Sequence, residues 1–336
     1  MSATARLTMP DLAPAFPGPF PSSPHAEQVG AHLEEWLERF PLLAPSGKRR
    51  VLCDIVAHGV ARTFPTADPD GLRLTADLFL WLTAFDDVHG EEAAAADPAG
   101  LVRRIQPCVH QLGGGAAPLG ADPFDAALRD LLARLRDRAT AEQYLRVAGC
   151  LRDVLFGMVW EAHRPAGDGD GDGSGGAGDG SVGFGAGGSG LREYREVRPH
   201  TVFARTLLAL AEVVLGYELP AADRDTSAVR EPEEAVADLA GVLNDLCSYA
   251  RESAKGAPAS LNLVPLLVRA HGGDLSAGYA AAARLAEERA AAARRGIDAL
   301  AAAGPAPLAR HAAALETIAH SYVWHVDHAR YRGAGG

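Results

Sequence analysis

The apolar residues of this chain recur with helical spacing over almost its whole length, and no useful stretch alternates in the manner of a strand. Ala, Leu, Arg and Glu are abundant, whereas Ile, Thr and aromatic residues are sparse, which favours helices over strands. Pro and Gly stand between the helical stretches, where they interrupt helices. Helices are expected from about 27 onward and at 47–63, 71–88, 97–112, 122–138, 140–163, 191–216, 230–255, 259–270, 275–303 and 308–331. The sequence therefore predicts an all-α fold in which short loops join the helices of one bundle.

Composition divides the chain into one domain with two irregular segments. Residues 1–24 are rich in Pro and Ser and are expected to form an extended arm, followed by a single helical domain over 25–336. Within that domain, thirteen of the twenty-four residues at 167–190 are Gly. Such a segment buries too little apolar surface to offset its ordering entropy, so we expect a flexible insert between two helices.

Charge and cysteine content exclude several classes of protein. The formal net charge is -11 and no basic stretch is visible, which argues against a nucleic-acid partner. The four cysteines form no CxxC pair, so they are expected to be buried thiols in a reducing compartment. The N-terminus does not resemble a signal peptide, and no apolar run reaches the length of a membrane span. These features predict a cytoplasmic protein, either a monomer or a homodimer.

An acidic cluster follows the apolar run at 78–82. It contains Asp86, Asp87 and Glu91, and on a continuous helix Asp87 and Glu91 would share a face. A helix C-terminus disfavours carboxylates because the helix dipole is negative there, so their clustering suggests a counterion. A solvated helix end is an equally good interpretation of this cluster alone.

A second polar cluster has a more specific spacing. Asn244, Ser248 and Glu252 recur every four residues, which places them in one stripe along a helix. An amide oxygen, a hydroxyl and a carboxylate are hard oxygen ligands that suit Mg²⁺. The alternative is a polar helix face, although apolar residues flank the stripe on both sides.

Together these clusters resemble the two metal-binding motifs of bacterial class I terpene synthases. The aspartate-rich motif of that family matches Asp86-Asp87-x-x-x-Glu91, and its Asn-Asp-x-x-Ser-x-x-x-Glu motif begins at Asn244 and ends at Glu252. The resemblance implies the class I terpenoid synthase fold, a helical bundle around a central active-site cavity. It also implies three Mg²⁺ ions that bridge the two motifs to the diphosphate of a prenyl substrate.

The resemblance extends to basic residues outside the two motifs. Arg198 matches the diphosphate-sensing arginine of the family, and Arg330-Tyr331 matches the pair on its last helix. Arg251, just before the glutamate of the second motif, matches a position that is usually basic. The resemblance therefore implies that Arg198, Arg251, Arg330 and Tyr331 bind diphosphate, and that Arg198, Arg330 and Tyr331 act in catalysis.

The segment after Arg198 departs from the family pattern. Pro199, Val202 and Phe203 stand where the family usually has a second Arg and a Gly, and the Gly-rich insert precedes them. The family uses a backbone carbonyl near the position of Val202 in ionisation, a role that any residue can fill. Pro199 disfavours helix at the residue before it, so we expect the helix to break near Arg198.

A carbocation requires a cavity without water, and Phe79, Leu82, Phe203 and Trp324 are the candidates to line it. We therefore expect a Mg²⁺-dependent terpene cyclase that ionises a linear prenyl diphosphate and closes the cation to a sesquiterpene or diterpene. Farnesyl diphosphate is the first candidate substrate and geranylgeranyl diphosphate the second. A chain-elongating prenyltransferase and a non-catalytic helical scaffold remain as alternatives.

Overall fold

The fold is known from a computed structural model that describes residues 7–116, 122–163, 189–255 and 261–326. Within these ranges the regular structure is entirely helical, which confirms the predicted all-α class. The helices are α1 (Ala26–Arg39), α2 (Gly47–Thr63), α3 (Pro69–His89), α4 (Glu91–Ala96), α5 (Pro98–Leu112), α6 (Pro123–Arg138), α7 (Ala141–Ala162), α8 (Ser189–Thr201), α9 (Ala204–Leu215), α10 (Ala221–Arg224), α11 (Ser227–Lys255), α12 (Leu263–Ala270), α13 (Leu275–Ala303) and α14 (Ala306–Val326).

Three of these helices begin in the same way, with an Asp followed by Pro. The carboxylate accepts the backbone N–H three residues later, and the proline occupies the first helical position, where no N–H is needed. These starts are Asp68-Pro69 at α3, Asp97-Pro98 at α5 and Asp122-Pro123 at α6. Local sequence thus fixes where these helices begin.

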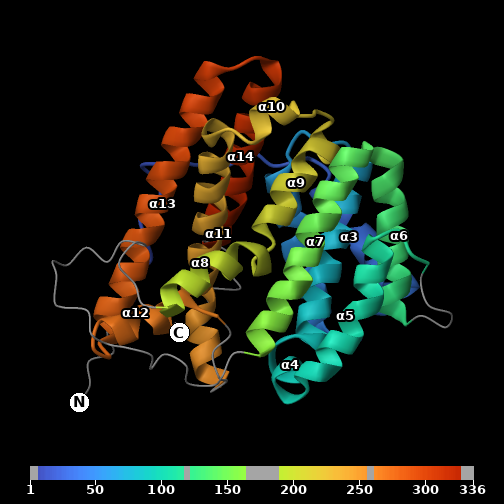
Figure 1. Ribbon diagram of the computed structural model, residues 1–336, viewed down its shortest axis with the longest axis horizontal. Coiled ribbons are helices and arrows are strands. Elements are labelled where there is room, and N and C mark those ends of the chain that lie inside the picture. The colour runs from blue at the N-terminus through green and yellow to red at the C-terminus, as the bar shows by residue number, and fades with distance from the viewer. Residues whose placement is uncertain (1–6, 117–121, 164–188, 256–260, 327–336) are drawn as a thin grey trace.

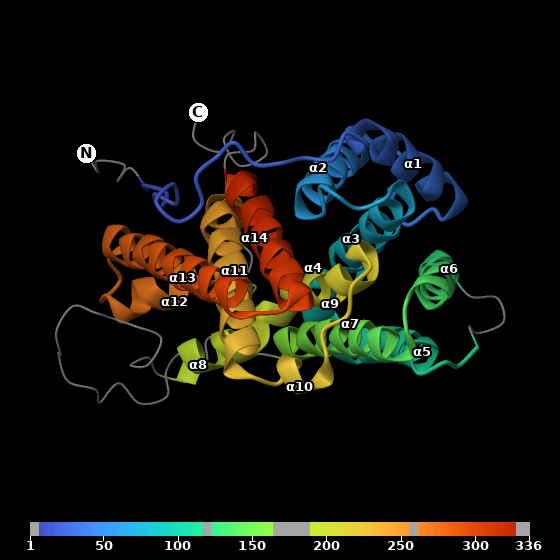
Figure 2. The same cartoon turned by 90° about the horizontal axis from the view of Figure 1, so that it is seen from above.

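Two groups of helices meet at α9. On one side α3 packs against α1, α2 and α6, and on the other α11 packs against α8, α12, α13 and α14. Between them, α9 contacts both α3 and α11 (Figure 1). The same division is visible from above in Figure 2. Helix α9 therefore contacts both the helix that carries Asp86 and Asp87 and the helix that carries the polar stripe.

The largest departure from the expected helix boundaries concerns 191–216. This stretch is two helices, α8 and α9, which are separated by Val202 and Phe203. The Gly-rich insert lies outside the described residues up to 188, and its last two residues already belong to α8. Two short helices, α4 and α10, were not expected.

Residues 7–25 contain no helix, and part of this segment packs on the bundle. Phe16 is buried, and its ring meets the ring of His320 in α14 edge-on, with 5.6 Å between centroids. The backbone N–H of Asp11 donates to Glu287 in α13 at 2.9 Å. The division into an arm and a single helical domain remains a prediction.

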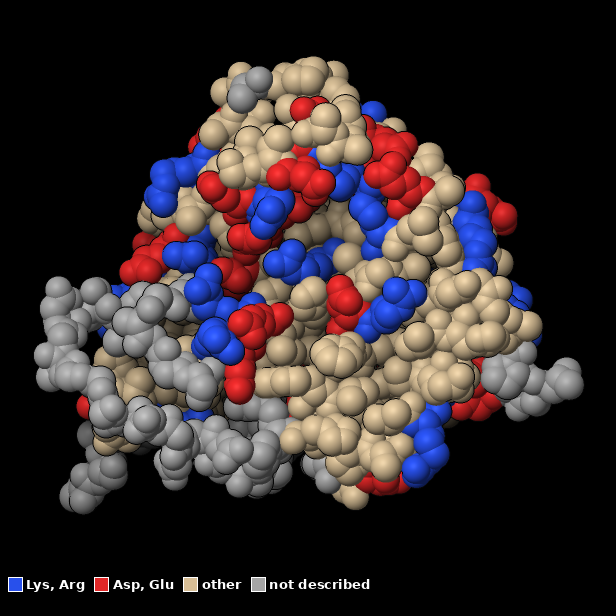
Figure 3. Space-filling model, in the orientation of Figure 1, with Lys and Arg blue, Asp and Glu red and all other residues tan. Residues whose placement is uncertain are grey.

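The described residues include no helix long and apolar enough to cross a membrane. Acidic and basic side chains are interspersed on the face shown in Figure 3. None of the four cysteines forms a disulfide; Cys53 and Cys108 are buried, whereas Cys150 and Cys247 are half-buried.

A buried carboxylate ties the C-terminal end of α9 to its neighbours. Glu212 is fully buried and accepts hydrogen bonds from Arg146 in α7 at 3.0 Å, from Arg224 in α10, and from the backbone N–H of Leu219 at 2.9 Å. Three donors compensate the desolvation of this charge. Glu212 therefore sets the position of α9 relative to α7 and α10.

Replacing Glu212 by Ala should lower the free energy of unfolding by about 3–5 kcal/mol, because it removes the buried carboxylate that Arg146 and Arg224 share. The control is Glu142→Ala, which removes the exposed partner of the same Arg146 and should cost less than about 1 kcal/mol. Urea denaturation measures both values. Equal losses in the two variants would contradict the assigned role of Glu212.

Candidate active site

The polar stripe of α11 presents its first two members on successive turns. Asn244 is half-buried and Ser248 is buried. The Ser248 hydroxyl accepts a hydrogen bond from the Asn262 amide at 3.4 Å. Glu252 belongs to the same helix, but its side chain lies outside the described part of the structure, as does that of Arg251.

Arg198, near the C-terminal end of α8, reaches this stripe. Its Nη2 donates to the Asn244 amide oxygen at 2.7 Å and to Asp245 Oδ1 at 2.6 Å, and its Nε donates to the same carboxylate oxygen at 2.9 Å. Nη1 donates to the Thr201 hydroxyl at 3.3 Å. Burial alone would lower the pKa of Arg198, but the charge of Asp245 outweighs it and raises the pKa, so the guanidinium stays protonated.

Asp245 is fully buried and turns away from the stripe that its neighbours form. Its second oxygen, Oδ2, accepts the backbone N–H of Leu263 at 2.8 Å. The Asn262 amide donates to the backbone carbonyl of Asp245 at 3.2 Å. Asp245 therefore joins α8, α11 and the start of α12. The motif alone did not indicate this role, although the offset of about 100° from Asn244 already placed Asp245 on another face.

The acidic cluster is divided by a helix end. Asp86 is half-buried and Asp87 exposed in the last turn of α3, which ends at His89. Gly90 follows with an extended backbone, and Glu91 opens α4. Asp87 and Glu91 therefore do not share one continuous helical face, and the predicted helix end at 88 agrees with the observed end at His89. The side chain of Glu91 is not described.

The described residues contain no cluster of three or more His, Cys, Asp or Glu side chains able to hold a metal ion. The donors present are nevertheless of the right kind: two carboxylates at the end of α3, and an amide and a hydroxyl oxygen on α11. The Asn244 oxygen has two lone pairs, of which Arg198 engages one. This donor set fits a hard divalent cation such as Mg²⁺.

The helix break lies later than Pro199 predicts. α8 continues through Pro199 to Thr201, and the break falls at Val202 and Phe203. Phe203 has a φ of 63°, in the left-handed region that a bulky side chain rarely adopts. The Tyr322 hydroxyl of α14 donates to the Val202 carbonyl at 3.2 Å. A tertiary contact therefore stabilises the break.

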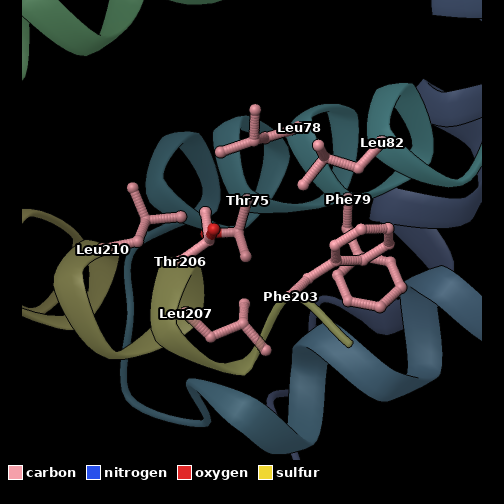
Figure 4. Close-up of a pocket in the computed structure, with 8 residues that line it drawn as sticks. All are labelled: Thr75, Leu78, Phe79, Leu82, Phe203, Thr206, Leu207 and Leu210. Atoms are coloured by element: carbon pink, nitrogen blue, oxygen red, sulfur yellow. The ribbon is translucent and has the colours of Figure 1, made fainter. Parts of the chain in front are cut away.

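Three of the four candidate lining residues come together in one small pocket between α3 and α9. Phe79, Leu82 and Phe203 line it, and the rings of Phe79 and Phe203 meet edge-on with 5.6 Å between centroids (Figure 4). Trp324 is not among the lining residues; its ring lies under the guanidinium of Arg62 in α2. Arg330 and Tyr331 lie outside the described residues.

The fold and the polar site together define a class I terpene synthase. Residues 77–168 and 189–292 match the model of terpene synthase family 2, C-terminal metal binding. A solved structure of linalool/nerolidol synthase from Streptomyces clavuligerus shares the fold, with a TM-score of 0.73 and 25% identity over 92% of this chain and 98% of that one.

Two relatives are similar over nearly their whole length, and both are (12E)-labda-8(17),12,14-triene synthases. The relative from Streptomyces cyslabdanicus is 49% identical and covers 98% of this chain and 95% of its own. The relative from Streptomyces anulatus is 50% identical and covers 97% and 96%. The chain belongs to the bacterial class I terpene synthase family.

The backbone strain at Phe203 can be measured with two variants that both remove the ring. Phe203→Ala should cost about 3–5 kcal/mol of stability through the lost packing. Phe203→Gly removes the same ring but relieves the left-handed strain, so it should be about 1 kcal/mol more stable than the Ala variant. Denaturant unfolding gives both values, and a Gly variant less stable than the Ala variant would mean that position 203 is not strained.

Proposed function

We propose that this protein is a Mg²⁺-dependent diterpene synthase that ionises a C20 prenyl diphosphate and releases a labdane-type triene. The observation that carries the proposal is the 49–50% identity to the two labdatriene synthases over almost the full length of all three chains. This observation favours a C20 substrate over farnesyl diphosphate, the first candidate from the sequence.

The product named for these relatives favours a substrate that already contains two rings. A labdane has a two-ring system and a side chain, and the 12 and 14 double bonds lie in the side chain. Departure of diphosphate with the C–O electron pair leaves an allylic cation at the end of that side chain, and loss of the proton from C12 completes the diene. No ring closure is needed. Geranylgeranyl diphosphate, the linear C20 candidate, would have to be cyclised at its other end as well.

The proposed diphosphate site combines both metal motifs with the basic residues. Asp86, Asp87 and Glu91 together with Asn244, Ser248 and Glu252 would hold Mg²⁺, with three ions expected from the family resemblance. Bound Mg²⁺ would act as a Lewis acid toward the leaving diphosphate. Arg198, Arg251, Arg330 and Tyr331 would donate hydrogen bonds to the diphosphate oxygens. The contact between Arg198 and Asn244 supports a shared site for the metal stripe and the guanidinium.

The hydrocarbon part of the substrate would lie toward Phe79, Leu82 and Phe203, whose apolar side chains exclude water from the cation. Aromatic faces add about 0.5–2 kcal/mol of stabilisation for each contact with a cation. Trp324 as a lining residue remains a prediction. A cytoplasmic location and a monomeric or homodimeric state also remain predictions.

Incubation with purified substrates tests the proposed activity. The protein should convert a bicyclic labdane diphosphate with a 13,14 double bond to a C20 triene, and only when Mg²⁺ is present. Farnesyl and linear geranylgeranyl diphosphates serve as comparisons. Gas chromatography–mass spectrometry identifies the hydrocarbon and a phosphate assay measures diphosphate release. Turnover of farnesyl diphosphate alone would contradict the C20 assignment, and no turnover of any substrate by folded protein would favour a non-catalytic scaffold.

Replacing Asn244 by Ala should reduce product formation by at least about 100-fold, because it removes an oxygen ligand of the proposed metal site. Asn244→Asp keeps an oxygen at the same place and should retain more activity. Product yield and the melting temperature are measured for both variants. Full activity in Asn244→Ala would remove α11 from the proposed metal site.

A further inference from the structure

The pocket between α3 and α9 is apolar except for two threonines. Thr75 from α3 and Thr206 from α9 both line it (Figure 4). The remaining lining residues are hydrophobic: Leu78, Phe79, Leu82, Phe203, Leu207 and Leu210. A buried polar atom in apolar surroundings is destabilising unless it forms a hydrogen bond, so an unpaired one suggests a functional role.

The two hydroxyls differ in how they are satisfied. Thr75 is 1% exposed, and its hydroxyl donates to the Gly71 carbonyl one turn earlier at 2.9 Å. This is the usual solution for a threonine inside a helix. Thr206 is 2% exposed, and its hydroxyl oxygen has no hydrogen-bond partner in the described structure.

The helix break explains why Thr206 lacks the usual bond. The carbonyl four residues earlier belongs to Val202, which precedes the left-handed Phe203 and lies outside α9. That carbonyl accepts the Tyr322 hydroxyl. Because of the break, the Thr206 hydroxyl does not bond to the acceptor that a continuous helix would offer.

A water molecule is a poor substitute partner at this place. A buried water needs two to four polar groups, and Thr206 and Thr75 are the only described residues lining the pocket with a polar side-chain atom, the Thr75 hydroxyl having already donated its proton to Gly71. An unsatisfied buried hydroxyl is destabilising, and a valine of the same shape would avoid that penalty. A threonine kept at position 206 despite this penalty points to a role for its hydroxyl toward a bound ligand.

We propose that Thr206 is a specificity-determining residue whose hydroxyl oxygen faces the hydrocarbon part of the substrate and stabilises positive charge on it. This inference rests on the proposed function and deepens it. In an apolar pocket an oriented dipole acts on a cation with little screening. One fixed hydroxyl would favour positive charge on the carbons nearest to it and so bias the position from which the proton is lost.

The test replaces Thr206 by Val, which keeps the shape and removes the hydroxyl. We expect the melting temperature to rise by about 2 °C, because an unsatisfied group is removed. At the same time product formation should fall about tenfold and the product should become a mixture of double-bond isomers. Thr206→Ser keeps the hydroxyl and should retain the product pattern of the unmodified protein.

The matched control is Thr63→Val in α2. Thr63 is 3% exposed, and its hydroxyl donates to the Gly59 carbonyl at 2.9 Å. This variant should not gain stability and should keep the product pattern. Melting curves, initial rates at several substrate concentrations and gas chromatography–mass spectrometry are recorded for all four proteins.

The possible outcomes separate this inference from the proposed function. A Thr206→Val variant with unchanged rate and products would overturn the inference while the proposed function stands. A lower melting temperature in that variant would show that the hydroxyl is bonded within the protein, and would also overturn the inference. An unmodified protein that releases no diphosphate from any prenyl substrate would overturn both.

Discussion

The buried pair of Arg198 and Asp245 is the contact on which the rest of the site depends. The two side chains are 12% and 0% exposed, so their desolvation is costly. The cost is offset because both carboxylate oxygens are satisfied, one by Arg198 and the other by the Leu263 N–H. A buried pair of this kind adds little net stability, but it holds the guanidinium in one orientation beside Asn244 and joins three helices.

The fixed end of α8 determines the path of the chain into α9. Four residues lie between Arg198 and Phe203, and in this stretch the helix ends and the chain turns. Tyr322 and the Phe79 ring hold this turn from outside, and Glu212 fixes the far end of α9. The polar site and the apolar pocket are therefore positioned relative to each other by one short helix that is held at both ends.

Most helix positions could be predicted from the sequence, and the two candidate metal-binding motifs could be located in it, because periodicity and four-residue spacings are local signals. The break at Val202 and Phe203 could not. Its only local signal, Pro199, placed the break too early, because the left-handed backbone of Phe203 is imposed by contacts from α3 and α14.

The partner of Asp245 could not be predicted from the sequence either, since Arg198 lies 47 residues away along the chain. The end of α3, by contrast, was predicted to within one residue, since the expected helix at 71–88 stops next to His89.

The charges of the site show why divalent ions would be required. Asp245 already neutralises Arg198, and Asp86 and Asp87 add negative charge at the end of α3. A diphosphate is itself a polyanion, so the described side chains alone would repel it more than they attract it. Cations held between the end of α3 and the stripe of α11, as proposed, would reverse that balance. Because Asp245 compensates the charge of Arg198, the guanidinium would then act on the diphosphate mainly through the direction of its N–H groups. The buried pair with Asp245 sets that direction.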